Sequence, residues 1–165
     1  MKIQDDLTKY ISTALNNTLP AKTKIKTRFH LLDAIVSILT GRLLPPGQKG
    51  FNFSKNQGGA EEATLLGNNI KVSAINAAFS NGMAAHANET DDSHTKGRFH
   101  PGCAIIPTTL AIAEKENLSS EEIFKGIALG YDIGVRFTTS LGYKTPKTSI
   151  FATHSIGPIF GSAAS

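Results

Sequence analysis

The segment from Asn81 to Gly102 reads NGMAAHANETDDSHTKGRFHPG and gathers the groups of this chain that are best suited to chemistry. Three of the five histidines lie in it, together with three carboxylates and the cations Lys96 and Arg98. Imidazoles titrate near neutral pH and can move protons, while cationic side chains can hold an anionic substrate. The segment therefore predicts either an acid–base site or a solvated charged loop.

The first part of the segment is expected to lie on a helix. Ser73 is typical of an N-cap, and the residues that follow it as far as Asn88 have helical periodicity. If the helix continues, His86 and Glu89 share a face with Ile75, and this face is expected to point into the core. A buried carboxylate or imidazole costs several kcal/mol unless it is paired, so such groups tend to be paired or functional.

The second part, residues 93–102, is expected to be a loop because Gly and Pro interrupt it. Loops held between helices often carry binding groups, and here His94, Lys96, Arg98 and His100 could surround an anion. His100 directly precedes a proline, which favours an extended backbone and so restricts where the imidazole points.

Structural roles are the alternative for several of these groups. His86 would then be a satisfied core residue. Asp91 and Asp92 would end the helix or cap the next segment, and Lys96 and Arg98 would belong to a solvated loop.

The rest of the chain has the pattern of a helical protein. Residues 43–59 are rich in Pro, Gly and Asn and are predicted to form a loop, and residues 60–66 a short helix. Pro107 is compatible with a helix only in its first turn. Further helices are expected over residues 1–16, 20–41, 103–116, 120–141 and from 156 onward, with a loop around Pro146. The expected fold class is all-α, a helical bundle in one domain of residues 1–165.

The helix over residues 120–141 has two specific signals. Ser119 and Glu122 form a capping box at its start. Gly126, Gly130 and Gly134 recur every four residues, and each costs roughly 1 kcal/mol against Ala in a helix. Such a face is expected where another helix packs closely against it.

Composition limits the function classes. The chain has 165 residues, of which 40% are hydrophobic, so it can bury a core. Its net charge of +4 comes without any Lys/Arg block, which disfavours nucleic acid and suits an anionic small molecule. The single cysteine, Cys103, excludes an internal disulfide and fits a reducing cytoplasm. Neither a signal peptide nor a membrane-spanning run is recognisable, so no membrane partner is expected.

Five stretches of the chain, in order, resemble the N-terminal part of the MmgE/PrpD family, which includes 2-methylcitrate dehydratase and cis-aconitate decarboxylase. The stretches are LLDAIVSILTGR, EEATLLGNNIKVSAINAAFSNGMAAHANETDD, HPGCAIIPTTLAIAE, GIALGYDIGVRF and THSIGPIFGSAAS. The family resemblance implies a large all-α domain, a smaller lid domain, a homodimer, and a metal-free active site between the domains. No cofactor is implied.

By motif, the resemblance places Glu89, Ser93, His100 and His154 at positions associated with the family's site. This chain has Glu89 where the family often has Asp, and Ser93 where it often has Thr. Residues 155–158 read SIGP where family members often read PTGT. The family's lid, its site lysines and its substrate-clamping tyrosine would lie outside these residues, so the chain is expected to be a truncated one.

The resemblance implies a lyase that acts on a small tricarboxylate, by dehydration, decarboxylation or isomerisation. His100 and His154 are then candidates to bind a substrate carboxylate or move protons, and Glu89 to orient an imidazole or act as base. The candidate substrate-binding residues are Ser93, Lys96 and Arg98.

Two other interpretations remain open. His86, His94 and His100 with the acidic cluster offer zinc or manganese ligands, although no tight ligand spacing supports a metal site. Alternatively, the chain is a catalytically incomplete fragment or split half that serves as a helical interaction module. A partner chain would then supply the missing part.

Overall fold

The computed structural model describes residues 2–141 and 152–165, and the predicted loop around Pro146 lies outside these residues. Helices dominate the described part, so the all-α prediction is confirmed. In chain order the elements are α1 (Ile3–Ala14), α2 (Ala21–Gly41), α3 (Pro45–Gln57), β1 (Ala63–Thr64), β2 (Lys71–Val72), α4 (Ala74–Ala85), α5 (Gly102–Glu116), α6 (Ser120–Ser140) and α7 (Thr153–Ala164). Within the described residues, no helix is both long enough and apolar enough to cross a bilayer.

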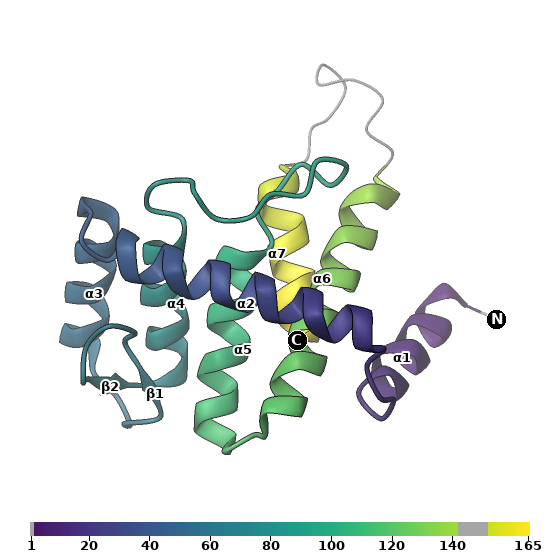
Figure 1. The fold of residues 1–165 in the computed structure, drawn as a ribbon, viewed down its shortest axis with the longest axis horizontal. Coiled ribbons are helices and arrows are strands. Elements are labelled where there is room, and N and C mark those ends of the chain that lie inside the picture. The colour runs from purple at the N-terminus through teal and green to yellow at the C-terminus, as the bar shows by residue number, and fades with distance from the viewer. Residues whose placement is uncertain (1, 142–151) are drawn as a thin grey trace.

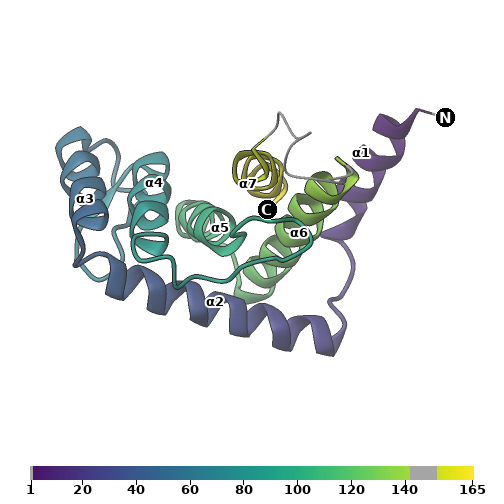
Figure 2. The same ribbon diagram turned by 90° about the horizontal axis from the view of Figure 1, so that it is seen from above.

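The helices are arranged along α2, which runs under α3, α4, α5 and α6 as a long crossing helix (Figures 1 and 2). α7 packs against α5 and α6 on the side away from α2, and α1 lies beside α6. Among the described residues, much of the core lies in three clusters of buried apolar side chains. Val72 belongs to the cluster under the hairpin, Ile106 and Ile127 to that between α2, α5 and α6, and Ile38 and Ala84 to that between α2 and α4.

The predicted loop over residues 43–59 is wrong, because Pro45–Gln57 form helix α3. Pro45 and Pro46 occupy the first turn, where the missing N–H groups have no helical partner to lose. Gly47 and Gly50 allow close packing, since a Cβ on Gly47 would lie 2.3 Å from the Gly41 carbonyl oxygen. The Pro and Gly residues thus start and pack a helix here.

The predicted short helix at residues 60–66 is also wrong. β1 pairs antiparallel with β2, with Ala63 opposite Val72. Glu114 of α5 holds this hairpin, accepting hydrogen bonds from the N–H and Oγ1 of Thr64, both at 2.7 Å. Lys71 lies 2.8 Å from the same carboxylate. A long-range contact therefore overrides the local helical preference.

Helix α4 begins after the predicted N-cap Ser73, whose side chain accepts from the Asn76 N–H, but it ends at Ala85 rather than continuing to Asn88. The face that was expected to point into the core points outward, with Ile75 82% exposed. α4 instead buries small residues, which let it approach α2, α3 and α5 closely. These buried residues are Ala74, Ala77, Ser80, Asn81, Ala84 and Ala85.

Helix α5 contains Pro107 beyond its first turn, contrary to the expectation. Proline has no N–H, so the carbonyl of Cys103 loses its usual helical partner. A Cβ on Gly82 of α4 would lie 3.0 Å from that carbonyl oxygen. The proline is therefore accommodated beside a closely packed neighbouring helix.

The predictions for α6 are confirmed. The capping box of Ser119 and Glu122 is formed, and α7 packs along the glycine face. A Cβ on Gly130 would lie 2.9 Å from the Gly161 carbonyl oxygen, and one on Gly134 would lie 2.8 Å from that of Gly157. The backbones of α6 and α7 are thus in contact, which places the start of α7 next to the segment that precedes α5.

We expect Gly134→Ala to destabilise the protein, although Ala is the better helix former by roughly 1 kcal/mol. The added methyl group would collide with the backbone of α7, so urea unfolding should give a lower free energy of unfolding. Gly50→Ala is the comparison variant, because the atoms nearest to its Cβ belong to the Met83 side chain, at 3.1 Å, and not to the backbone, so a smaller loss is expected. Equal or higher stability of Gly134→Ala would contradict the tight α6–α7 contact.

Candidate active site

Three imidazoles from three separate elements form a row. His86 caps the C-terminus of α4, His100 precedes the proline before α5, and His154 lies in the first turn of α7. The ring centroids of His86 and His100 are 4.9 Å apart, and those of His100 and His154 are 6.1 Å apart. The last two rings are stacked, with an interplanar angle of 23°. We call these three side chains the imidazole row.

The side chain of Asp91 lies beneath this row with 0% exposure. Its Oδ1 is 3.0 Å from Nδ1 of His86, and its Oδ2 is 3.5 Å from Nδ1 of His100. The Asp91 carbonyl oxygen is also 3.3 Å from Nδ1 of His100. Because an ionised carboxylate can only accept hydrogen bonds, this arrangement favours a proton on both Nδ1 atoms and leaves each Nε2 free to act as a base.

The adjacent residue, Asp92, serves a separate set of donors. Its carboxylate accepts hydrogen bonds from the Tyr131 hydroxyl at 2.8 Å and the Gly102 N–H at 2.9 Å, and Nδ1 of His30 lies at 2.8 Å. Burial raises the pKa of Asp92, but the hydrogen bonds from His30, Tyr131 and Gly102 outweigh it and hold the pKa below its ordinary value. Asp92 thus caps α5 and joins it to α2 and α6, as one of the sequence alternatives proposed.

Cys103 lies on the inner side of the row. Its thiol donates to the His100 carbonyl oxygen at 3.3 Å. Burial, followed by the charge of Asp91, raises the pKa of this thiol to about 12. The thiol therefore stays protonated at neutral pH, which disfavours a role as nucleophile.

A hollow of about 420 Å³ between α4 and α5 adjoins the imidazole row. His86 and Cys103 reach its wall from the site, and the remainder of the lining is largely apolar. The full lining is Ala78, Phe79, Gly82, Met83, His86, Cys103, Ala104 and Thr108. The exposed face of α4 therefore forms one wall of a concave surface next to the site.

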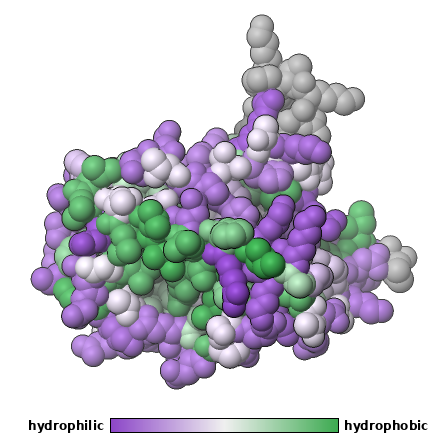
Figure 3. All heavy atoms as spheres, viewed as in Figure 1, coloured by the Kyte–Doolittle hydropathy of each residue, from purple (hydrophilic) through white to green (hydrophobic). Residues whose placement is uncertain are grey.

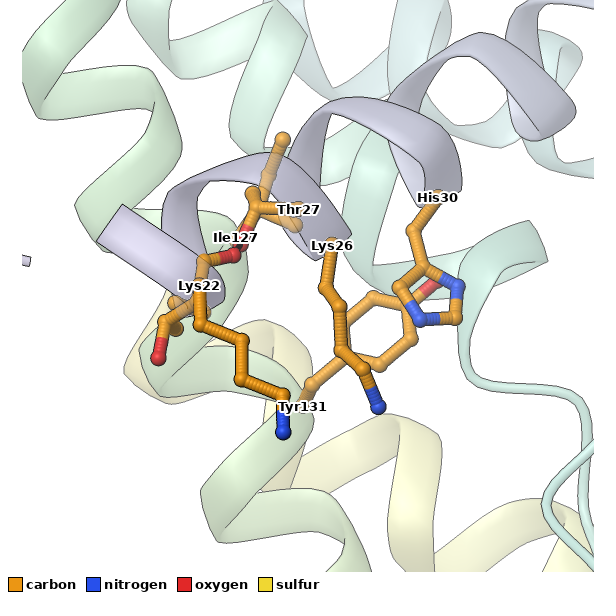
Figure 4. A pocket seen from close by; sticks show the side chains of 8 residues that line it. Lys22, Lys26, Thr27, His30, Ile127 and Tyr131 are labelled. Atoms are coloured by element: carbon orange, nitrogen blue, oxygen red, sulfur yellow. Dashed lines mark hydrogen bonds between the residues drawn. The ribbon is translucent and has the colours of Figure 1, made fainter. Parts of the chain in front are cut away.

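A second hollow of about 320 Å³ lies between α2 and α6, on the other side of Asp92 (Figure 4). Lys22 and Lys26 extend from α2 past the ring of Tyr131, and His30 lies beside that ring. The hollow offers two ammonium groups to an anion. No member of the imidazole row lines it, so we place the acid–base chemistry on the α4–α5 side.

A family model described as the MmgE/PrpD N-terminal domain matches residues 5–165. The chain belongs to the MmgE/PrpD family. No curated protein matches the chain. All three histidines of the imidazole row, and Asp91, lie within the matched residues.

In this MmgE/PrpD chain, the structure brings together two of the three predicted catalytic residues, His100 and His154. Glu89 lies on the turn after α4 with its side chain exposed. Among residues 2–141 and 152–165, its carboxylate has no hydrogen-bond partner, and Asp91 is the carboxylate that contacts the imidazoles. The expectation that Glu89 lies on an inward helical face is therefore wrong, because α4 ends before it.

The predicted substrate-binding residues Ser93, Lys96 and Arg98 are exposed on the loop between α4 and α5. This loop passes over the ends of α5 and α7 in Figure 1. The Arg98 carbonyl accepts a hydrogen bond from Thr153 Oγ1 at 2.8 Å, which ties the loop to the start of α7. Both Glu89 and Arg98 have a φ of 52°, an uncommon conformation that is enriched at functional sites.

The alternative of a metal site drew on His86, His94, His100 and the acidic cluster, and the fold brings together a different group. Within the described residues, the group with metal-ligand spacing is His86, Asp91 and Cys103, whose donor atoms lie within 4.8 Å of one another. His94 instead accepts the Gly97 N–H at its own Nδ1, 2.9 Å away. A cation bound by His86, Asp91 and Cys103 would have to displace the Cys103 proton, because the thiolate is the form that binds metals.

Sequence reasoning missed the roles of Asp91 and His30. The sequence placed Asp91 in the acidic run but carried no signal for its burial, which depends on where α4 ends. His30 also offered no such signal, because its partner Asp92 is far away in sequence.

We expect Asp92→Asn to lower the free energy of unfolding by about 1–3 kcal/mol near neutral pH, since it removes the acceptor of several buried donors. Folding lowers the pKa of Asp92, so its contribution is complete above the unfolded pKa of about 3.9 and is lost as the pH falls through the lower folded value. Urea unfolding at several pH values should therefore show the gap between wild type and variant closing in acid. Glu61→Gln, at an exposed carboxylate, is the control. A gap that is independent of pH would contradict the role of the charge.

Proposed function

We propose that this chain carries the acid–base part of a lyase site that acts on a small tricarboxylate. The observation that supports it best is the imidazole row, with two rings held on one buried carboxylate. Such an arrangement presents Nε2 atoms of defined tautomer, which can take a proton from carbon or give one to a departing group. Membership in a family that consists generally of lyases agrees with this chemistry.

In this proposal His100 and His154 bind a substrate carboxylate or move protons. Their stacked rings come from different elements, His100 from the end of the α4–α5 loop and His154 from the first turn of α7. A substrate at the row would therefore contact both of these segments. Dehydration of a substrate such as 2-methylcitrate needs a base for a carbon-bound proton and an acid for the leaving hydroxyl. Decarboxylation of a substrate such as cis-aconitate needs an acid that protonates the resulting carbanion.

The cations of the loop hold the substrate carboxylates in the same proposal. Lys96 and Arg98 are exposed on the loop that leads to His100, and Ser93 offers a hydroxyl donor. Arginine recognises carboxylates through paired hydrogen bonds, whereas lysine supplies a point charge. The hydrogen bond from Thr153 to the Arg98 carbonyl holds the backbone of Arg98 at the start of α7, next to His154 in sequence.

In this proposal Asp91 and Glu89 share the two roles that sequence analysis gave to Glu89 alone, orienting an imidazole and acting as base. Asp91 orients the imidazoles, because it contacts two of them. Glu89 remains the proposed base on the exposed side of the site, where a substrate could reach it. The reaction proceeds without a metal or other cofactor in this proposal, and a lid carried by a further domain or a partner chain encloses the substrate.

A non-catalytic helical module is the second candidate. It is favoured by the exposed apolar side chains along α2, which indicate that this helix binds another surface. This candidate predicts association without turnover, so the assays below separate it from the lyase.

We expect His100→Ala and His154→Ala each to reduce turnover of 2-methylcitrate or cis-aconitate by roughly 100-fold or more, as removal of an acid–base group does. The assay should measure product by mass spectrometry, with the chain alone and with a family protein that supplies the lid. His94→Ala is the matched control, since His94 bonds locally to Gly97. Near-normal rates for the first two variants would refute their roles, and a wild-type chain inactive in both settings would favour the non-catalytic module.

We expect Asp91→Asn to reduce turnover and also to change the imidazole tautomers, because an amide can donate to Nδ1 as well as accept from it. Nitrogen-15 NMR of the histidine rings reports the tautomer without an activity assay. Wild type should show protonated Nδ1 on His86 and His100, and the variant a mixture. Glu89→Gln should leave the tautomers unchanged, and an unchanged spectrum for Asp91→Asn would contradict the orienting role.

A further inference from the structure

Three side chains at one end of the imidazole row have the spacing of metal ligands. They are His86 at the end of α4, Asp91 between α4 and α5, and Cys103 in the first turn of α5. One donor atom of each lies within 4.8 Å of the other two, and within the described residues no other set of three such ligands has this spacing. The proposed lyase chemistry gives Cys103 no role. We call these three side chains the His–Asp–Cys group.

The group is close to the size of a zinc coordination sphere. Zinc bonds of about 2.0–2.3 Å in a tetrahedral site separate the ligand atoms by roughly 3.3–3.8 Å. Nδ1 of His86 and Oδ1 of Asp91 are already 3.0 Å apart. Because no separation in the group exceeds 4.8 Å, closing it around an ion requires a movement of about 1 Å. Rotation of one side chain supplies a movement of this size.

The charges of the group match a divalent cation. An ionised Asp91 and a thiolate at Cys103 would contribute one negative charge each, and a neutral His86 none. A bound dication would therefore leave no net charge, which is important because the Asp91 side chain has no exposure to water. Thiolate and imidazole ligands also favour zinc over magnesium and calcium, which prefer oxygen.

The protonated thiol is the obstacle to binding, and the ion itself removes it. Without a cation, burial and the charge of Asp91 raise the pKa of Cys103 to about 12. A dication reverses both effects, because it attracts the thiolate directly and neutralises the carboxylate. The zinc–sulfur bond forms as the S–H bond breaks, the proton passes to solvent, and no atom changes its oxidation state.

The hollow between α4 and α5 gives an ion access to the group. His86 and Cys103 both line this hollow, and the His86 side chain is 42% exposed. Asp91 lies behind the imidazole, away from water. An ion that enters from the hollow would exchange waters for these three ligands and keep one water on the open side, as three-ligand zinc sites do.

We propose that the His–Asp–Cys group is a zinc site that inhibits the imidazole row. Zinc at Nδ1 of His86 moves the proton of that ring to Nε2, which then cannot act as a base. Zinc also neutralises Asp91, whose Oδ2 lies 3.5 Å from Nδ1 of His100, so the second imidazole loses its charged partner. Binding depends on the three ligands alone, whereas the inhibition rests on the proposed function.

The first test is the binding of cobalt(II) and zinc to the reduced chain. Co²⁺ accepts the same ligands as Zn²⁺, and its absorption spectrum reports whether one of them is a thiolate. We expect a thiolate-to-cobalt charge-transfer band in the near ultraviolet, which an equivalent of Zn²⁺ abolishes. Mg²⁺ at the same concentration should leave the band unchanged, because it prefers oxygen ligands.

Variants of the ligands locate the ion. Cys103→Ser should remove the band and weaken Zn²⁺ binding by roughly 100-fold or more, because losing a direct ligand costs more than losing an outer partner. His86→Ala should weaken binding by a similar factor. Isothermal titration calorimetry measures both dissociation constants, and circular dichroism checks that the variants fold. His94→Ala is the matched control and should bind Zn²⁺ as wild type does, since His94 bonds locally to Gly97.

The second test follows the imidazoles without any assay of turnover. Nitrogen-15 NMR of the histidine rings should show the proton of His86 on Nδ1 in the metal-free chain and on Nε2 after one equivalent of Zn²⁺. The signals of His94 should not change. A chain that binds zinc in this way but turns over no substrate would refute the lyase and leave the zinc site standing.

Other outcomes overturn a stated part of the proposal. A wild-type chain that binds Zn²⁺ no more tightly than Cys103→Ser excludes the thiol as a ligand, and with it the site. Binding that is lost in His94→Ala assigns the ion to another part of the loop. A His86 tautomer that zinc leaves unchanged excludes control of the row by the metal.

Discussion

A fully buried carboxylate is the constraint on which the candidate site depends. Asp91 has no access to water, so its charge must be satisfied by protein donors, and the donors within reach are the Nδ1 atoms of His86 and His100. These two histidines come from the end of α4 and from the loop before α5. The two carboxylate oxygens of Asp91 therefore hold the end of α4 and the loop before α5 together.

The next residue, Asp92, is a second carboxylate, and its hydrogen bonds come from a different set of helices. Asp92 accepts from α2, α6 and the first residue of α5, through His30, Tyr131 and the Gly102 N–H. Two consecutive residues thus connect the site to most of the helices around it. The third imidazole arrives by a different route, because contact between the backbones of α6 and α7 at the glycine face places His154 beside His100. The imidazole row thus has two causes: hydrogen bonding to Asp91 positions His86 and His100, and close packing of α6 and α7 positions His154.

Local signals in the sequence predicted the parts of the fold that depend on local interactions. The N-cap at Ser73, the capping box at Ser119 and the glycine face of α6 involve neighbouring residues or a repeated spacing, and all are present. α3 was missed because Pro and Gly are typical of loops but also occur at helix starts and at close helix contacts. Here the glycines pack against α2 and α4, which the local sequence does not reveal. In the site, His100 and His154 came from a family resemblance. The role of Asp91 rests on where α4 ends, which periodicity does not determine.

Two helices, α2 and α4, expose large apolar side chains and bury mainly small residues. Both cases have the same physical origin. Apart from Ile38, the apolar residues that α2 and α4 bury are small, whereas both helices expose large ones such as Phe29 on α2 and Ile75 on α4. Small residues allow helices to approach closely, which gains packing within the domain but leaves the larger apolar side chains without a partner. An apolar stripe at helical spacing therefore does not reveal whether the stripe or the opposite face of the helix is buried in its own domain. On α4 the uncovered face forms a wall of the hollow beside the imidazole row, and on α2 the uncovered face (Figure 3) carries Ile25, Phe29, Leu32, Val36 and Leu39.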